Sequence, residues 1–170
     1  MNPLTLLSRD FTDDAEAWAA LIVFACGFLL CGALIMEHAF DMAPCPLCLM
    51  QRIWFTLAGL VALASLIHSP RWGIYPLLTI LACLVGAGFA IRQLWLQSLP
   101  ADQVPSCGPD MAYMLENFPL ADVLAAMTSG TGDCAEVSWR FLGLTLPGWA
   151  LAGFTAIAIM AARQLRSATR

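Results

Sequence analysis

The sequence of 170 residues contains no lysine and few charged residues of any kind. Charged residues make up 12% of the chain and hydrophobic residues 60%, whereas soluble domains average about 25% and roughly 45–50%. Because a chain with so little charge cannot cover its surface with polar groups in water, we expect lipid to be its solvent. The net charge of −4 gives no indication of nucleic-acid binding, and all eight basic residues are arginines.

In place of charge, the sequence has four apolar stretches, each close to the length of about 20 residues that a helix needs to cross the hydrocarbon layer. Backbone polar groups in lipid have to be satisfied within their own segment, so these stretches predict helices. We predict an all-α, integral membrane four-helix bundle, a single domain over 1–170, with helices at about 16–38, 46–68, 72–96 and 143–164. For the first stretch a cleaved signal peptide is the alternative, but the stretch is longer than a signal core and follows several acidic residues.

The arginines indicate how the bundle is oriented. One side of the predicted bundle holds Arg9, Arg71, Arg163, Arg166 and Arg170. The long connection at about 97–142 lies on the other side, and Arg140 is its one clear basic residue. By the positive-inside rule, both chain ends are cytoplasmic and the connection faces outward. Its amphipathic run over 111–127, interrupted by Pro119, predicts one or two short helices on the membrane surface, with packing against the bundle as the alternative.

The seven cysteines fall into two groups. Three lie inside apolar stretches, where we expect small buried hydrophobic residues: Cys26, Cys31 and Cys83. Four lie on the outward side: Cys45, Cys48, Cys107 and Cys134. Thiols outside the cytoplasm tend to be oxidised, and four cysteines allow three pairings. Pairing of sequence neighbours, 45 with 48 and 107 with 134, is the simplest of the three.

Cys45 and Cys48 lie at the start of the second predicted helix, one turn apart, where Pro46 fits the first turn. The positive end of the helix dipole favours a thiolate, and a thiolate that forms readily also leaves readily. The spacing therefore predicts a redox-active disulfide. Arg52 follows Cys48 by four residues, and we expect it to stabilise a Cys48 thiolate and to bind an acceptor oxygen. An arginine reaching toward lipid headgroups is the alternative.

Cys107 and Cys134 would close a loop of about 28 residues. A stable bridge there would contribute roughly 3–4 kcal/mol, so a structural disulfide is one interpretation. The other is a reactive bridge, because Cys107 lies among Pro105, Gly108 and Pro109, an irregular setting open to another protein's thiolate. We expect no metal site. Zinc would need a second close pair of ligands, and haem attachment would need a histidine at position 49, which is leucine.

Taken together, these residues resemble the disulfide bond formation protein B family. The resemblance rests on three blocks: Pro44-Cys45-Pro46-Leu47-Cys48 with Gln51-Arg52; Trp95-Leu96-Gln97; and Gly132-Asp133-Cys134-Ala135-Glu136 with Trp139, Phe141-Leu142-Gly143-Leu144, Pro147 and Trp149. The third block, in this order along the chain, is highly specific. The match covers nearly the whole sequence.

The resemblance implies a thiol:quinone oxidoreductase of the bacterial inner membrane with its cysteine-bearing segments in the periplasm. A reduced DsbA-like thiol oxidase would attack the bridge between Cys107 and Cys134, with Cys107 forming the mixed disulfide. Cys134 would then attack Cys45, leaving Cys48 as a thiolate that faces a membrane quinone, either ubiquinone or menaquinone. The family's arginine at the position of Arg52 supports quinone binding. The bilayer is the remaining partner, and no nucleic acid is expected.

Gln93 departs from the family pattern, because many members carry a histidine there that is linked to the quinone site. Glutamine can still bind a quinone oxygen but cannot change charge near neutral pH. Trp139 is expected near the quinone headgroup, with a place in an interfacial aromatic belt as the alternative. Two further functions stay open. One is a vitamin K epoxide reductase-like thiol oxidoreductase, which the third block disfavours, and the other is a non-catalytic scaffold with structural disulfides.

Overall fold

The structure is a computed structural model that describes residues 14–100, 102–108 and 111–168. Arg9, Arg170 and Pro109, which the sequence analysis uses, lie outside the described residues, so the prediction of one domain over 1–170 stays a prediction. Four long helices dominate the fold: α2 (Ala15–Ala39), α3 (Pro46–His68), α4 (Ile74–Gln97) and α7 (Leu146–Ala168). Within the described residues, these four are long and apolar enough to cross a membrane.

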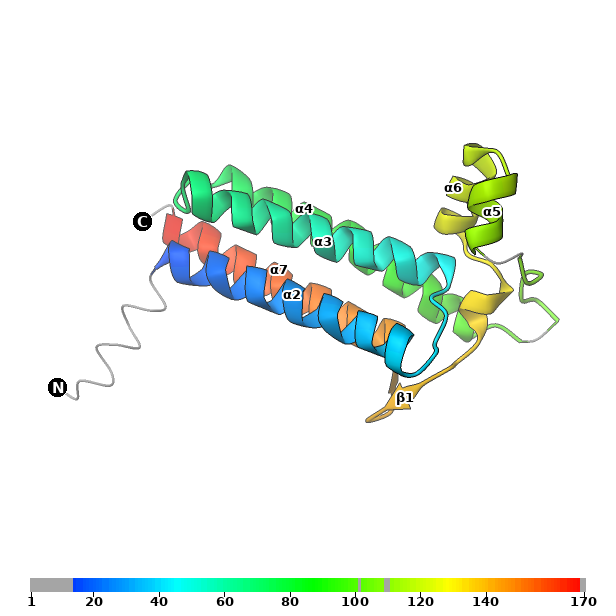
Figure 1. Ribbon diagram of the computed structural model, residues 1–170. Helices are drawn as coiled ribbons and strands as arrows, with labels where there is room; N and C mark the ends of the chain where they lie inside the picture. Colours follow the sequence, from blue (N-terminus) through cyan, green and yellow to red (C-terminus); the bar gives the residue numbers. More distant parts are fainter. Residues whose placement is uncertain (1–13, 101, 109–110, 169–170) are drawn as a thin grey trace.

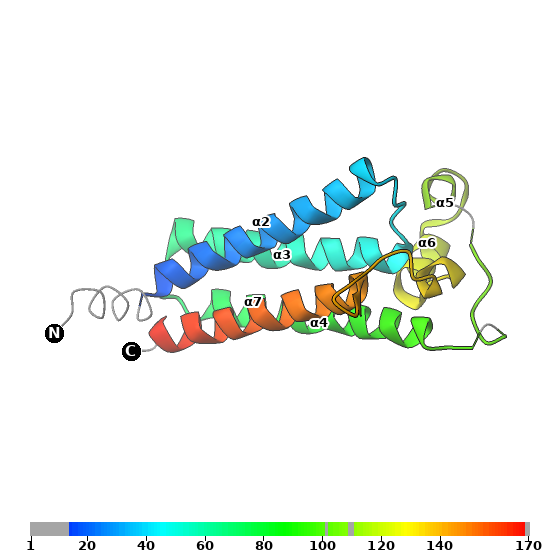
Figure 2. The ribbon, with the colours of Figure 1, turned by 90° about the horizontal axis from the view of Figure 1, so that it is seen from below.

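The four long helices form one bundle (Figure 1). Helix α2 packs against α3 and α7, and α4 packs against the same two helices. Helix α2 begins and α7 ends at the same end of the bundle as the short connection between α3 and α4. The opposite end, called the outer end below, carries the connection between α2 and α3 and the long segment between α4 and α7. Toward it, α2 diverges from α4 and α7 (Figure 2). The predicted all-α membrane bundle is confirmed.

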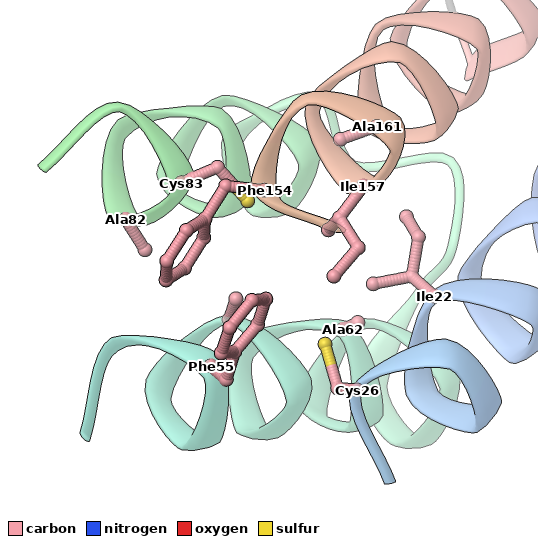
Figure 3. Close-up of a cluster of buried hydrophobic side chains, with 10 residues drawn as sticks. Ile22, Cys26, Phe55, Ala62, Ala82, Cys83, Phe154, Ile157 and Ala161 are labelled. Carbon is pink, nitrogen blue, oxygen red and sulfur yellow. The ribbon is translucent and has the colours of Figure 1, made fainter. Parts of the chain in front are cut away.

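The core of the bundle consists of one stacked pair of aromatic rings, two isoleucines and small residues (Figure 3). The rings of Phe55 on α3 and Phe154 on α7 stack with their centroids 3.7 Å apart. Gly86 of α4 makes room for them, since a Cβ atom at this position would lie 2.3 Å from the Phe154 ring. In this core, α4 and α7 thus approach each other as closely as a glycine allows.

Two of the three cysteines inside the apolar stretches lie in this core, as expected: Cys26 and Cys83 are almost fully buried. The expectation of burial is wrong for Cys31, which is exposed on α2. In lipid the outer surface of a helix is as apolar as its core, so a small apolar residue gains little by facing inward.

The long segment at the outer end contains three short helices: α5 (Met111–Asn117), α6 (Leu120–Ser129) and the single 3-10 turn η1 (Gly132–Ala135). Pro119 separates α5 from α6, as the sequence predicts. Helix α6 packs against α3, and η1 packs against both α3 and α4. For α6, therefore, packing against the bundle is what the structure shows, although Leu120 and Leu124 stay exposed.

A small hairpin precedes the last helix and was not expected from the sequence. Strands β1 (Arg140–Phe141) and β2 (Leu144–Thr145) pair antiparallel. The two residues between them, Leu142 and Gly143, have φ angles of 50° and 81°, positive as in the two-residue turns that suit hairpins. Because the hairpin takes up 140–145, α7 begins at Leu146 and not at about 143.

Candidate active site

The first cysteine pair lies at the outer end, where the chain enters α3. Cys45 has an extended backbone (φ −70°, ψ 162°), and Pro46 is the first residue of the helix. Proline is favoured here because the N–H group that it lacks would have no helical partner in the first turn. Cys48 follows one turn later, and the Sγ atoms of the two thiols lie 2.9 Å apart. The local sequence thus places two sulfurs in direct contact at a helix N-terminus.

Gln93 of α4 contacts both of these sulfurs. Its Nε2 atom donates to Sγ of Cys45 and to Sγ of Cys48, at 3.3 Å each. Gln51 of α3 in turn donates from its Nε2 atom to Oε1 of Gln93, at 2.7 Å. Both glutamines are almost fully buried, with exposed fractions of 3% for Gln93 and 5% for Gln51. The structure therefore places Gln93 on the cysteine pair, while its predicted contact with a quinone stays a prediction.

Gln51 is a residue of the site that was not predicted from the sequence. It was noted only as part of a motif, and no role was assigned to it. Its position three residues after Cys48 is the helical spacing that brings two side chains to one face, and a glutamine in an apolar helix needs a hydrogen-bond partner. Those two signals were present in the sequence, but nothing in the sequence indicates which residue of α4 is the partner of Gln51.

Cys134 is brought to the same place by η1. Its side chain is fully buried against Leu47 of α3 and Leu96 of α4, and Cys45 packs on the same group. The hydrogen bond from the Cys45 thiol holds the pKa of Cys134 well below its usual value, and the backbone N–H groups of Leu47 and Thr131 act in the same direction. The same contact raises the pKa of Cys45, which keeps its proton. We call Cys45, Cys48 and Cys134 the sulfur cluster.

Cys107 lies outside this cluster and is exposed. The segment that contains Cys107 is held against η1, because the N–H group of Gly132 donates to the carbonyl of Ser106 at 3.2 Å. A Cβ atom at Gly132 would lie 2.5 Å from the Pro105 carbonyl oxygen, so glycine is needed for this approach. A hydrogen bond with the Asp133 carboxylate raises the pKa of Cys107. The segment at the outer end thus presents one exposed and one buried cysteine on neighbouring stretches of chain.

Arg52 does not contact the sulfur cluster. Its guanidinium forms an ion pair with Glu37 of α2 and donates to the carbonyl of Ala33 at 3.2 Å. Among the described residues, the partners of the Arg52 guanidinium are thus on α2, and the expected contact with Cys48 is not formed. A carboxylate near the lipid boundary attracts the guanidinium more strongly than a neutral thiol does, which explains its turn toward α2. Its role toward a quinone stays a prediction.

Trp139 lies in an aromatic group formed around the hairpin. Its ring stacks on Phe141 with centroids 5.6 Å apart, and Phe141 also contacts the ring of Trp149. The indole N–H of Trp149 donates to the Phe141 carbonyl at 3.2 Å. These contacts anchor the hairpin on the start of α7, and the proposed place of Trp139 near a quinone headgroup stays a prediction. Among the described residues, no group of three or more His, Cys, Asp or Glu side chains is arranged to hold a metal ion.

Fold and site together define a class: a multi-pass membrane protein with a cluster of cysteine thiols at one end of a four-helix bundle. Residues 15–164 match the family described as disulfide bond formation protein DsbB. The chain belongs to this family, and the disulfide-forming oxidoreductase activity of the family follows from that membership.

Individual relatives agree with the family match. The disulfide bond formation protein B of Hahella chejuensis is 52% identical over 146 residues, which cover 80% of this chain and 88% of the relative. The protein of the same name from Marinobacter nauticus is 52% identical over 143 residues, covering 82% of this chain and 85% of the relative. In Nitrosococcus oceani the identity is 44% over 151 residues, with 84% and 89% covered.

Proposed function

We propose that this protein generates disulfides by reoxidising a periplasmic thiol oxidase of the DsbA type and passing the electrons to a membrane quinone. It acts in the bacterial inner membrane, with both chain ends in the cytoplasm and the outer end of the bundle in the periplasm. One observation supports this most directly: Cys45 packs on the buried group that contains Cys134, interacts with the Cys134 sulfur, and is itself in contact with Cys48. Cysteines from two distant parts of the chain thus meet at the point where electrons would pass between them.

The first half of the relay is a pair of thiol–disulfide exchanges, with disulfides between Cys107 and Cys134 and between Cys45 and Cys48 at the start. A thiolate of the reduced partner attacks Cys107, which is exposed, and forms a mixed disulfide while Cys134 leaves as a thiolate. The backbone N–H groups of Leu47 and Thr131 favour a thiolate at Cys134, and they do so even while Cys45 is held in its own bridge, which makes Cys134 a good leaving group. Cys134 then attacks Cys45, and Cys48 is released as a thiolate beside the Gln93 amide.

The second half restores both bridges. The partner's second thiol attacks its own sulfur in the mixed disulfide, so that the partner leaves oxidised and Cys107 is freed. Cys107 attacks Cys134 and reforms their bridge, which frees Cys45 as a thiol. Cys45 and Cys48 then rejoin as a disulfide and give up two electrons and, in total, two protons. The net reaction turns two partner thiols and one quinone into one disulfide and one quinol.

Arg52 and the neighbouring surface of α2 support a quinone, which would supply a lipid-soluble acceptor for two electrons and two protons. A quinone needs an apolar surface for its ring and a hydrogen-bond donor for its oxygen. Arg52, one turn deeper in α3, has five N–H donors on its guanidinium and is 21% exposed. On α2, the helix that Arg52 contacts, a shallow and mostly apolar hollow of about 450 Å³ is lined by Leu34, Ile35, His38 and Ala39.

The alternatives differ in chemistry that can be measured. Family membership favours the disulfide bond formation proteins over a vitamin K epoxide reductase-like protein. A scaffold with structural disulfides would keep both bridges oxidised below about −300 mV, whereas relay bridges are reduced at milder potentials. The contact between Cys134 and Cys45 favours the relay, since two independent structural bridges would have no need to meet.

The test is anaerobic mixing of the purified protein with a reduced DsbA-type oxidase and a ubiquinone or menaquinone analogue, following quinol formation and trapping mixed disulfides. We expect Cys107→Ser and Cys48→Ser to abolish turnover, and Cys107→Ser also to remove the trapped mixed disulfide. Arg52→Ala should weaken the use of quinone more than binding of the partner. Cys31→Ser, on the exposed surface of α2, is the matched control and should turn over normally. Full turnover by either Cys107→Ser or Cys48→Ser contradicts the relay.

A further inference from the structure

The sulfurs of Cys45 and Cys48 are contacted by an uncharged group, the side-chain amide of Gln93. An amide has two N–H donors on nitrogen and an acceptor oxygen, and its orientation decides which of them faces the sulfurs. In this structure the nitrogen is the nearer atom, at 3.3 Å from each sulfur, while Oε1 accepts from the protonated Cys48 thiol at 3.7 Å. This orientation matters because an N–H group stabilises a sulfur that carries negative charge, whereas a carbonyl oxygen would repel it.

Gln51 fixes that orientation. Its Nε2 atom donates to Oε1 of Gln93 at 2.7 Å, at the short end of the range for N–H···O hydrogen bonds, and both side chains are buried. If the Gln93 amide turned over while Gln51 kept its orientation, two N–H groups would face each other at this point and the oxygen would face the sulfurs. Both sides of the Gln93 amide would then be unfavourable at once, so the hydrogen bond from Gln51 selects one orientation.

We infer that Gln51 is a positioning residue, which holds the Gln93 amide so that its N–H groups stabilise the thiolate formed at Cys48. The Arg52 guanidinium does not stabilise the Cys48 thiolate in this arrangement, because it is directed to Glu37 and Ala33 of α2. The Gln93 amide is the group in contact with the sulfur. The inference rests on the proposed function only for its consequence in turnover. The thiol chemistry itself can be tested with neither a quinone nor a partner protein present.

The experiment measures how fast iodoacetamide alkylates Cys48, since the thiolate is the reactive form. The full-length chain carries Cys48 as its only cysteine, with serine at 45, 107 and 134 and alanine at the three positions within α2 and α4. We expect Gln51→Met to slow alkylation about tenfold at fixed neutral pH, the loss of one hydrogen bond to a charged group. Gln93→Met should slow it by at least as much.

The double variant separates positioning from packing. If Gln51 acts through Gln93, adding Gln51→Met to Gln93→Met causes no further slowing. Gln164→Met is the matched control, because Gln164 is also a buried glutamine of a long helix but bonds to Ser65 and the Pro70 carbonyl at the other end of the bundle. It should leave the alkylation rate unchanged.

Unfolding in detergent, followed by circular dichroism, shows whether each variant is folded, and Gln51→Leu replaces Gln51→Met if the latter is not. An unchanged alkylation rate in a folded Gln51 variant overturns the inference, and so does a further tenfold loss in the double variant. If alkylation responds as expected while the unmodified protein fails to reduce quinone, the positioning role stands and the proposed function falls.

Discussion

Each cysteine at the outer end has a different electrostatic environment. The thiol of Cys45 donates a hydrogen bond to Cys134. This contact raises the pKa of Cys45 and lowers the pKa of Cys134. Cys107 instead faces the carboxylate of Asp133, which accepts a hydrogen bond from the thiol and disfavours a negative charge on sulfur. In the bridge between Cys107 and Cys134, the backbone N–H groups of Leu47 and Thr131 still favour a thiolate at Cys134 when Cys45 has no thiol to donate. Cys134 is therefore the better leaving group, and an incoming thiolate is directed to Cys107.

Removing the carboxylate beside Cys107 should lower the pKa of its thiol. Asp133 is the largest cause of the raised pKa, through its hydrogen bond and then its charge, and Glu136 contributes less. In a chain with Cys107 as its only cysteine, we expect the pH midpoint of alkylation to fall in Asp133→Asn, because the thiolate then forms at lower pH. Glu136→Gln, the control, should shift the midpoint in the same direction by less. A midpoint in Asp133→Asn equal to that of the unchanged chain would show that the contact does not form.

At the scale of elements, the packing of α4 on α7 depends on one face of α4. Gly86 and Gly88 lie two residues apart on this helix, and only Gly86 faces the Phe154 ring. A Cβ atom at Gly86 would overlap that ring, whereas one at Gly88 would have nothing within 4 Å. We expect Gly86→Ala to cost about 1–3 kcal/mol, the usual penalty for overfilling a core.

Gly88→Ala is the control for that prediction. It should leave stability unchanged or raise it slightly, because alanine favours the helix over glycine by about 0.5–1 kcal/mol. Thermal unfolding of both variants in the same detergent provides the measurement. Equal melting temperatures for the two variants would contradict the close approach of α4 and α7.

The elements were predicted from the sequence far better than the contacts between them. The long helices follow from apolar length, and the contact between Cys45 and Cys48 follows from helical spacing, since both signals are local. The hairpin was missed because strands of two residues show no alternation. The bond between Gln51 and Gln93 joins α3 to α4 across 42 positions of sequence, and no local pattern indicates which residue of α4 faces Gln51. Arg52 was assigned to the sulfurs for the same reason, because its partner Glu37 lies on another helix.

At the scale of the whole molecule, the two ends of the bundle carry different kinds of side chain. The outer end holds all four of the cysteines assigned to the relay. Its long segment contains one described arginine, Arg140, and the acidic residues Asp102, Glu116, Asp122, Asp133 and Glu136. The other end holds Arg71, Arg163 and Arg166 among the described residues, near the α3–α4 connection and the end of α7. The positive-inside rule predicts that the arginine-bearing end faces the cytoplasm, and the cysteines would then face the compartment where thiols are oxidised.

This orientation predicts which end a membrane-impermeant maleimide reaches in spheroplasts of the producing bacterium. A chain with Cys107 as its only cysteine should be labelled from outside, because Cys107 is exposed at the outer end. A cysteine-free chain carrying Ser69→Cys, in the connection between α3 and α4, should be labelled only after the membrane is permeabilised. Labelling of Ser69→Cys but not of Cys107 in intact spheroplasts would show that the protein has the opposite orientation. The sulfur cluster would then face the reducing cytoplasm, where a periplasmic oxidase cannot reach Cys107, and the proposed relay would have no source of electrons.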